Sequence, residues 1–180
     1  AQRGDEGMAA ADGAPGTAYL GALCWIGTLV AFAYLNFETF QFFGVLYRPL
    51  RTPGTTFLWA ALCAFLAWRV ARGDHLVATP LLAIFGTALL YKLVLADMPA
   101  FGFDPKAVLF PPADYDPVAA AMRGSTFAIV LLLALGTFLL VPRKDPAGRI
   151  LGTIFGFVGV GLLLLYLTLE LNALLSVFRP

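Results

Sequence analysis

Five long apolar segments, separated by short charged or proline-containing connections, dominate this sequence. A helix needs about 20 predominantly apolar residues to cross the hydrocarbon core of a bilayer. Only 13% of the residues are charged and 60% are hydrophobic, whereas about 25% of the residues of an average soluble domain are charged. So few charges cannot cover a water-exposed surface. We therefore predict an integral membrane protein of the all-α class, a polytopic bundle of about five transmembrane helices.

The connections between the apolar segments set the predicted boundaries. The expected spans cover residues 17–47, 54–70, 76–97, 124–141 and 149–178, within a transmembrane domain of residues 17–180. Residues 1–16 are rich in Gly and Ala and lack an apolar period, so we expect a flexible lead-in. Residues 98–123 form the long predicted connection, expected on the outer side. Connections of this length are often functional; the alternative is a cap-like structural loop.

One pattern occurs near the end of the first span and again near the end of the fifth. Residues 34–49 read YLNFETFQFFGVLYRP and residues 166–180 read YLTLELNALLSVFRP. Upstream, Gly27 and Gly159 match at the same offset. The aromatic-Arg-Pro endings supply the predicted helix-exit corners, Arg48, Pro49, Arg179 and Pro180. Because four spans separate the two starts, both copies cross in the same direction. We predict a parallel internal repeat of four-span units, unlike the inverted repeats common in secondary transporters.

Three ionisable residues fall inside predicted spans: Glu38, Lys92 and Glu170. A charge at membrane depth costs a few kcal/mol or more, so it is normally paired or lines a cavity. At helical rise, Glu38 lies about 15 Å and Lys92 about 7 Å from the same membrane surface. We therefore predict a Glu38–Lys92 contact; the alternative is that neighbouring polar groups or water satisfy Glu38 and lipid headgroups satisfy Lys92. We expect Glu170 to have no partner within this chain.

The recurring glutamates allow two interpretations. In the first, Glu38 and Glu170 belong to a proton or cation relay, a common role of intramembrane acids. In the second, each is a structural anchor that fixes the end of its helix against neighbouring helices. The same acid recurs at the same point of each predicted unit, which favours the structural anchor.

Sequence motifs for catalysis and cofactor binding are absent. The chain contains no phosphate-binding glycine loop, no zinc-protease motif and no nucleophile elbow. Its single histidine, His75, falls in a predicted loop, and Cys24 and Cys63 lie in apolar runs without metal-ligand spacing. The net charge of +1 gives no field for nucleic acid. We predict no catalytic, cofactor-binding or metal-binding residue and no nucleic-acid partner.

The predicted outer loop contains acids that could bind a hard cation through carboxylate oxygens. These possible outer-loop acids are Asp104, Asp114 and Asp116. The alternative, which we favour, is that they are solvated loop acids.

Several short motifs resemble a known bacterial family. The motifs are YLTLELNALL in the fifth predicted span, TTFLWAALCAFLA in the second, and LLYKLVLADMPAF at the end of the third. The residues that carry the likeness are Tyr166, Glu170, Asn172, Leu58, Trp59, Lys92 and Asp97. The chain resembles the family of very large, many-spanning predicted membrane proteins catalogued only as a domain of unknown function. The resemblance implies many spans and no agreed activity.

The sequence favours a non-catalytic scaffold or accessory subunit, not an enzyme, that packs with other membrane helices. One alternative is a transporter or channel component that uses Glu38, Lys92 and Glu170. A second is a membrane enzyme that acts on a lipid-linked substrate. The expected partners are the lipid bilayer and either other membrane subunits or further spans of a longer chain.

We expect this protein in the bacterial inner membrane with a cytoplasmic N-terminus. With that orientation, the inner segments carry Arg3, Arg69, Arg72, Arg143, Lys144 and Arg149, and the outer segments carry Arg48, Arg51, Lys106, Arg123 and Arg179. Basic residues are more frequent in cytoplasmic loops. The count therefore favours this orientation by a narrow margin.

Overall fold

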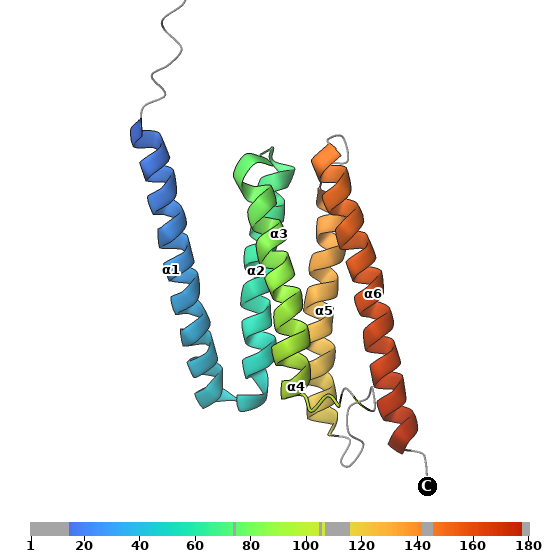
Figure 1. Ribbon diagram of the computed structural model, residues 1–180. Coiled ribbons are helices and arrows are strands. Elements are labelled where there is room, and N and C mark those ends of the chain that lie inside the picture. Colours follow the sequence, from blue (N-terminus) through green and yellow to red (C-terminus); the bar gives the residue numbers. More distant parts are fainter. Residues whose placement is uncertain (1–14, 74, 105, 107–115, 142–145, 178–180) are drawn as a thin grey trace, which may run out of the picture. The chain divides into compact units, whose positions relative to one another are not determined.

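The computed structural model describes residues 15–73, 75–104, 106, 116–141 and 146–177. The elements are α1 (Pro15–Leu46), η1 (Arg48–Leu50), α2 (Arg51–Ala71), α3 (His75–Lys92), the π-helical η2 (Leu93–Asp97), α4 (Met98–Ala100), α5 (Pro117–Leu140) and α6 (Pro146–Val177) (Figure 1). Five helical segments in this part of the chain are long and apolar enough to cross a membrane. The predicted all-α fold with about five spans is therefore confirmed, and the repeat stays a prediction.

Some sequence predictions fall outside the described residues. They concern residues 1–14 of the lead-in, Asp114, Arg179 and Pro180. Cys24 lies within α1, but its side chain is not among those described.

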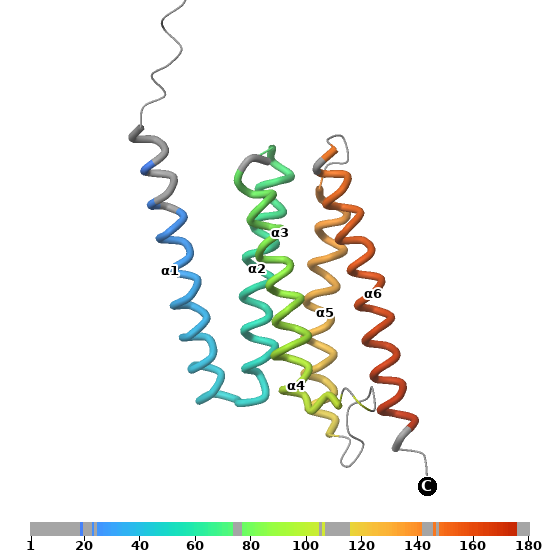
Figure 2. Tube along the Cα trace, viewed as in Figure 1, coloured from blue at the N-terminus to red at the C-terminus, as the bar shows by residue number. Residues whose placement is uncertain are grey.

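The chain divides into two compact units, residues 1–38 and residues 39–180. The first contains most of α1. In the second, α2, α3, α5 and α6 run alternately up and down (Figures 1 and 2). Helix α2 packs against both α3 and α5, and α5 packs against α6. Helices α2 and α5 therefore form the centre of this unit.

Small and hydroxyl side chains make up much of the buried surface of the two central helices. The buried residues of α2 include Thr56, Ala60, Cys63, Ala67 and Val70, and those of α5 include Thr126, Val130, Ala134 and Thr137. Their spacing of three or four residues places each set on one helix face. Lipid tails are as apolar as leucine, so membrane helices associate through close packing of small residues. The sequence supplies that small-residue face on both helices.

The connection between α1 and α2 is a tight corner. Helix α1 ends at Leu46, and Tyr47 adopts an extended backbone before the single turn of η1. Proline at the second position of η1 has no N–H to bond and stops α1 from continuing. The Arg51 guanidinium lies over the Phe40 ring, 4.4 Å from its centre. The predicted helix break at Arg48-Pro49 is therefore present.

Three helices begin at least three residues before the predicted start of their span, α6 among them, at Pro146 instead of residue 149. Helix α2 begins at Arg51 instead of residue 54, because Pro53 falls in the first helical turn, where its missing N–H costs little. Helix α5 begins at Pro117 instead of residue 124, since the Asp116 carboxylate accepts a hydrogen bond from the Val118 N–H at 2.9 Å and caps the helix. The last seven residues of the predicted outer loop, 117–123, are consequently helical and part of a span.

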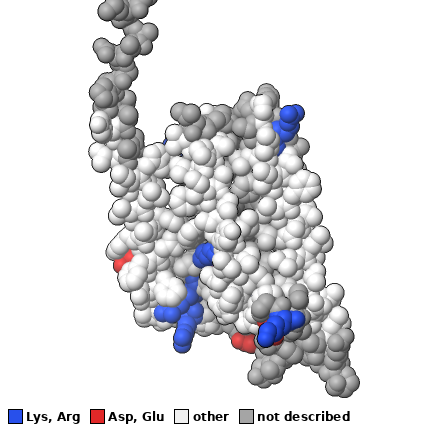
Figure 3. All heavy atoms as spheres, in the orientation of Figure 1, with Lys and Arg blue, Asp and Glu red and all other residues white. Residues whose placement is uncertain are grey.

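Figure 3 shows one face of the molecule, with few charged side chains along its middle. Lysine and arginine gather towards one end, over the α1–α2 corner and near α4.

Candidate functional site

A buried cluster joins α2 to the end of α3. The Lys92 Nζ donates to Asp97 Oδ1 at 2.6 Å, to Asp97 Oδ2 at 2.8 Å and to Thr56 Oγ1 at 2.7 Å. The Thr56 hydroxyl donates in turn to Asp97 Oδ2 at 2.7 Å. The side chains of Lys92 and Asp97 are only 15% and 4% exposed. All three donors of the ammonium therefore have partners, and its charge is neutralised inside the bundle.

The π-helix η2 explains why Lys92 meets an acid five residues further along. In an α-helix, side chains three or four residues apart are neighbours. The wider π-helix bonds residues five apart and brings position five back to the same side. Because Leu93–Asp97 is π-helical, Lys92 and Asp97 face each other and both face Thr56 of α2.

A second buried ion pair joins α5 to α6. The Arg123 guanidinium donates from Nε to Glu170 Oε2 at 3.2 Å and from Nη2 to Glu170 Oε1 at 3.0 Å. The side chains of Arg123 and Glu170 are 7% and 13% exposed. Paired bonds of this kind match the planar fork of arginine to a carboxylate. The prediction that Glu170 has no partner in this chain is wrong, because Arg123 lies inside α5 and not in a loop.

Tyr166 extends this contact one turn along α6. Its ring packs on Phe127 with centroids 4.9 Å apart. A methyl group at Gly124 would lie 3.0 Å from the Tyr166 hydroxyl oxygen. A side chain at this position would require the tyrosine to shift slightly, so glycine suits this close approach. Glu170 and Tyr166 of α6 thus contact the neighbouring residues Arg123 and Gly124 of α5.

Glu38 differs from Glu170 in its surroundings. Its carboxylate interacts electrostatically with the Tyr34 side chain, four residues earlier on α1. Glu38 belongs to the first unit and Lys92 to the second. The Glu38–Lys92 contact therefore stays a prediction, although the Lys92 ammonium has a carboxylate partner in Asp97.

The acids of the predicted outer loop serve the local backbone where the structure describes them. Asp104 Oδ1 accepts from the Lys106 backbone N–H at 2.9 Å, and Asp116 caps α5. Groups of three or more metal-ligating side chains do not occur in the part of the chain that the structure describes.

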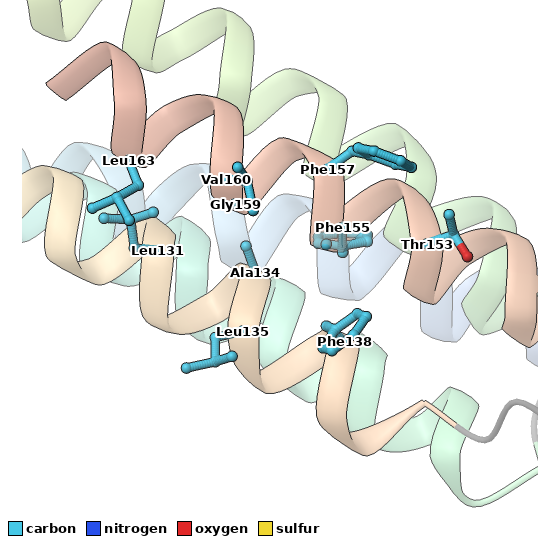
Figure 4. A pocket seen from close by; sticks show the side chains of 11 residues that line it. Leu131, Ala134, Leu135, Phe138, Thr153, Phe155, Phe157, Gly159, Val160 and Leu163 are labelled. Carbon is cyan, nitrogen blue, oxygen red and sulfur yellow. The ribbon is translucent and has the colours of Figure 1, made fainter. Parts of the chain in front are cut away.

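An apolar groove of about 590 Å³ runs between α5 and α6. Figure 4 shows Leu131 of α5 beside Leu163 of α6 towards one end of it and Phe138 near Phe155 towards the other. A smaller cavity of about 150 Å³ lies where α3, α5 and α6 meet. Neither is lined by a charged residue. The ion pairs therefore do not line these spaces.

Sequence reasoning missed three residues of the site: Thr56, Asp97 and Arg123. Arg123 was assigned to a loop, although the Asp116-Pro117 start of a helix was a readable signal. Asp97 entered the sequence analysis only among the residues that carry the family resemblance, and not as a partner of Lys92. The Asp97 side chain points towards Lys92 because Leu93–Asp97 is π-helical. No sequence motif predicts a π-helix at this position.

The fold and these contacts define a helical membrane protein with charges paired inside its bundle. Comparison with protein-family models, curated protein sequences and solved structures finds no match to this chain. The resemblance to the many-spanning bacterial family stays a prediction.

Proposed function

We propose that this chain is a non-catalytic structural subunit that packs with other helices in the membrane. The observation that carries the proposal is the internal pairing of its buried charges, Lys92 with Asp97 and Arg123 with Glu170. Charges on a transport path normally face a water-filled cavity. Here each charge is held by a neighbour within the bundle, an arrangement suited to fixing helices against one another.

The apolar surface supports the same role. Large apolar side chains on α5, among them Leu132 and Leu139, each 68% exposed, face outwards. Large apolar side chains on α6, among them Phe157 at 76% exposed, also face outwards. Such faces suit lipid and partner helices.

A parallel repeat of four-span units is part of the proposal. Asn36 and Thr168 occupy matching positions after the two Tyr-Leu pairs. Each side chain donates to the carbonyl four residues back, Asn36 to Phe32 at 3.2 Å and Thr168 to Leu164 at 2.8 Å. Such bonds are common for these side chains inside helices and occur also at Thr126 and Thr153, so the matched residues alone support a common origin of α1 and α6.

We also propose a bacterial inner-membrane location with a cytoplasmic N-terminus. Arg51 and Arg123 of the outer set and Arg69 and Arg149 of the inner set lie inside helices. The remaining basic residues number four on the inner side and three on the outer side. Under the positive-inside tendency, this count favours that orientation by the same narrow margin.

Flux measurements on reconstituted liposomes test the proposed function. The wild-type chain and the variant Lys92→Met/Asp97→Leu are inserted into vesicles that contain a pH-sensitive dye. We expect proton and cation leakage at the level of protein-free vesicles for both. The control is Arg149→Gln, at the exposed start of α6. The structural role would be contradicted if the wild type and this control conduct ions and the variant Lys92→Met/Asp97→Leu does not.

One observation favours a transporter component as the second candidate. The η2 segment between Lys92 and Asp97 is π-helical, and single π-turns occur frequently at functional sites. The same flux experiment decides between the two candidates. The enzyme alternative has no supporting contact among the described residues.

A further inference from the structure

We propose that the Lys92–Asp97 ion pair and the π-turn of η2 together form a two-state conformational device. While the pair is made, Leu93–Asp97 is π-helical, as the structure shows. When the pair is broken, the same residues become α-helical and the short helix α4 turns about its axis. Every part of the device lies within residues 39–180. Such a device goes beyond the proposed packing function, because it gives the bundle a segment that moves.

The local sequence of η2 favours an α-helix. Its five residues, Leu-Val-Leu-Ala-Asp, include neither glycine nor proline, and alanine and leucine are among the strongest α-helix formers. A π-helix is rare and occurs mostly as a single turn inside an α-helix. Sparsely populated backbone conformations persist only where the surrounding structure holds them. The π form of η2 therefore needs a stabilising contact from outside its own backbone.

The ion pair is a contact that only the π form allows. In this form the Met98 N–H donates to the Leu93 carbonyl, five residues earlier. An α-helix advances about 100° per residue, so in the α form the Asp97 side chain would point about 140° away from Lys92. The π-turn instead brings the carboxylate within 2.6 Å of the ammonium nitrogen, where it also accepts a bond from the Thr56 hydroxyl at 2.7 Å. Because charge-assisted hydrogen bonds are about twice as strong as neutral ones, the pair favours the π form.

The α form also has a definite arrangement. Helix α3 stays in place because it packs against α2, so loss of the extra residue of the π-turn turns α4 by about 100° and moves it about 1.5 Å along the helix axis. Ala96 then takes the direction in which Asp97 now points, towards Thr56, and position 97 takes the direction of Met98. Met98 is only 3% exposed, and such a direction suits an apolar side chain better than a carboxylate. Loss of the charge at position 97 therefore favours the α form twice, since it removes both the pair and the cost of burying the acid.

Pro99 offers a competing explanation for the π-turn. Proline has no N–H to donate, and in an α-helix its ring clashes with the carbonyl four residues earlier, which here belongs to Leu95. Local π-turns are one way in which membrane helices accommodate a proline. The two explanations differ in the expected effect of Pro99→Ala. If the ion pair holds the π form, the turn persists without the proline; if the proline holds it, the turn is lost although both charged residues remain.

Crosslinking between α2 and the η2 segment reports the register of η2. The reporter is the cysteine pair Thr56→Cys/Ala96→Cys in the full chain with both native cysteines replaced, treated in bicelles with a short, uncharged bifunctional thiol reagent. In the π form position 96 is exposed and position 97 faces α2, so we expect little crosslink. In Lys92→Met/Asp97→Leu, position 96 faces position 56, and we expect the yield to rise about tenfold or more as the equilibrium moves to the α form. Mass spectrometry of proteolytic fragments identifies the linked residues.

Three control chains separate the ion pair from its alternatives. The exchanged pair Lys92→Asp/Asp97→Lys keeps opposite charges at both positions, and Pro99→Ala keeps the native pair, so both should give the low yield of the parent chain. Thr56→Cys/Val94→Cys places the second thiol at a position that is 48% exposed and should crosslink in no background.

Three results would overturn the proposal. A high yield in Pro99→Ala would show that the proline holds the π-turn. A low yield in Lys92→Met/Asp97→Leu would show that the π form persists without the pair. An equal rise at position 94 in that variant would show disorder instead of a change of register. None of these yields depends on the flux test, which measures the passage of ions.

Discussion

Replacing Arg123 with leucine should destabilise the bundle strongly. The change leaves the Glu170 carboxylate, only 13% exposed, without its two hydrogen bonds from the guanidinium. Breaking a buried ion pair by removing one partner costs about 3–5 kcal/mol. A neutral interhelical hydrogen bond in a membrane protein is worth only about 0.6–1.7 kcal/mol. We therefore expect Arg123→Leu to lower the free energy of unfolding by about 3–5 kcal/mol. A loss of this size indicates a buried charge without a partner, because a lost hydrogen bond alone costs less.

The double variant sharpens this prediction. Arg123→Leu/Glu170→Leu removes both charges and replaces them with apolar groups, which is often close to neutral. We expect it to lie within about 2 kcal/mol of wild type, so the two single changes are far from additive. Equilibrium unfolding in bicelles, followed by steric trapping, gives the free energy of unfolding for each variant. Arg149→Leu, at an exposed position on α6, is the control and should change stability by less than about 0.5 kcal/mol. A loss below about 1 kcal/mol for Arg123→Leu, or additive losses in the double variant, would refute the reasoning.

Three further predictions concern the second unit of the chain. Thr56→Val removes the hydroxyl that bridges the lysine–aspartate pair, so it should lower the free energy of unfolding by about 1–3 kcal/mol. The same unfolding assay measures this loss, and an unchanged stability would show that the bridge is dispensable. Gly54→Ala should lower the thermal midpoint because its methyl group would overlap the Phe43 ring, whereas Gly161→Ala, with open space around it, should not; equal midpoints would contradict the packed corner. Cys63 is 0% exposed, so in a Cys24→Ser background it should resist maleimide until the protein unfolds, as mass spectrometry can follow; rapid modification of the folded chain would contradict its burial.

The helices could be predicted from the sequence because the bilayer dictates length and composition. Apolar runs had to be helical and about 20 residues long, and Arg48-Pro49 had to end the first of them. Boundaries at proline were less certain. The predicted spans begin after Pro53 and Pro117, yet each proline lies in the first turn of its helix, where proline is tolerated.

The partners of the buried charges could not be predicted in the same way. Sequence position gave the depth of Lys92 and Glu170, but not the direction in which each points. Asp97 reaches Lys92 only because a π-turn rotates it, and Arg123 reaches Glu170 only because α5 begins a full two turns earlier than predicted. The π-turn depends on local backbone geometry that composition does not encode, whereas the early start of α5 could have been predicted from Asp116-Pro117.

Cysteine accessibility at position 56 tests the central claim most directly, because Thr56 sits between Lys92 and Asp97. In a chain lacking both native cysteines, Thr56→Cys is exposed in sealed vesicles to a charged, membrane-impermeant methanethiosulfonate reagent, applied from either side. Gly73→Cys, in the exposed α2–α3 turn, is the reactive control. Buried pairs that hold helices together predict no reaction at position 56 from either side while position 73 reacts. Modification of position 56 would show that water reaches the charges, and would contradict a purely structural role.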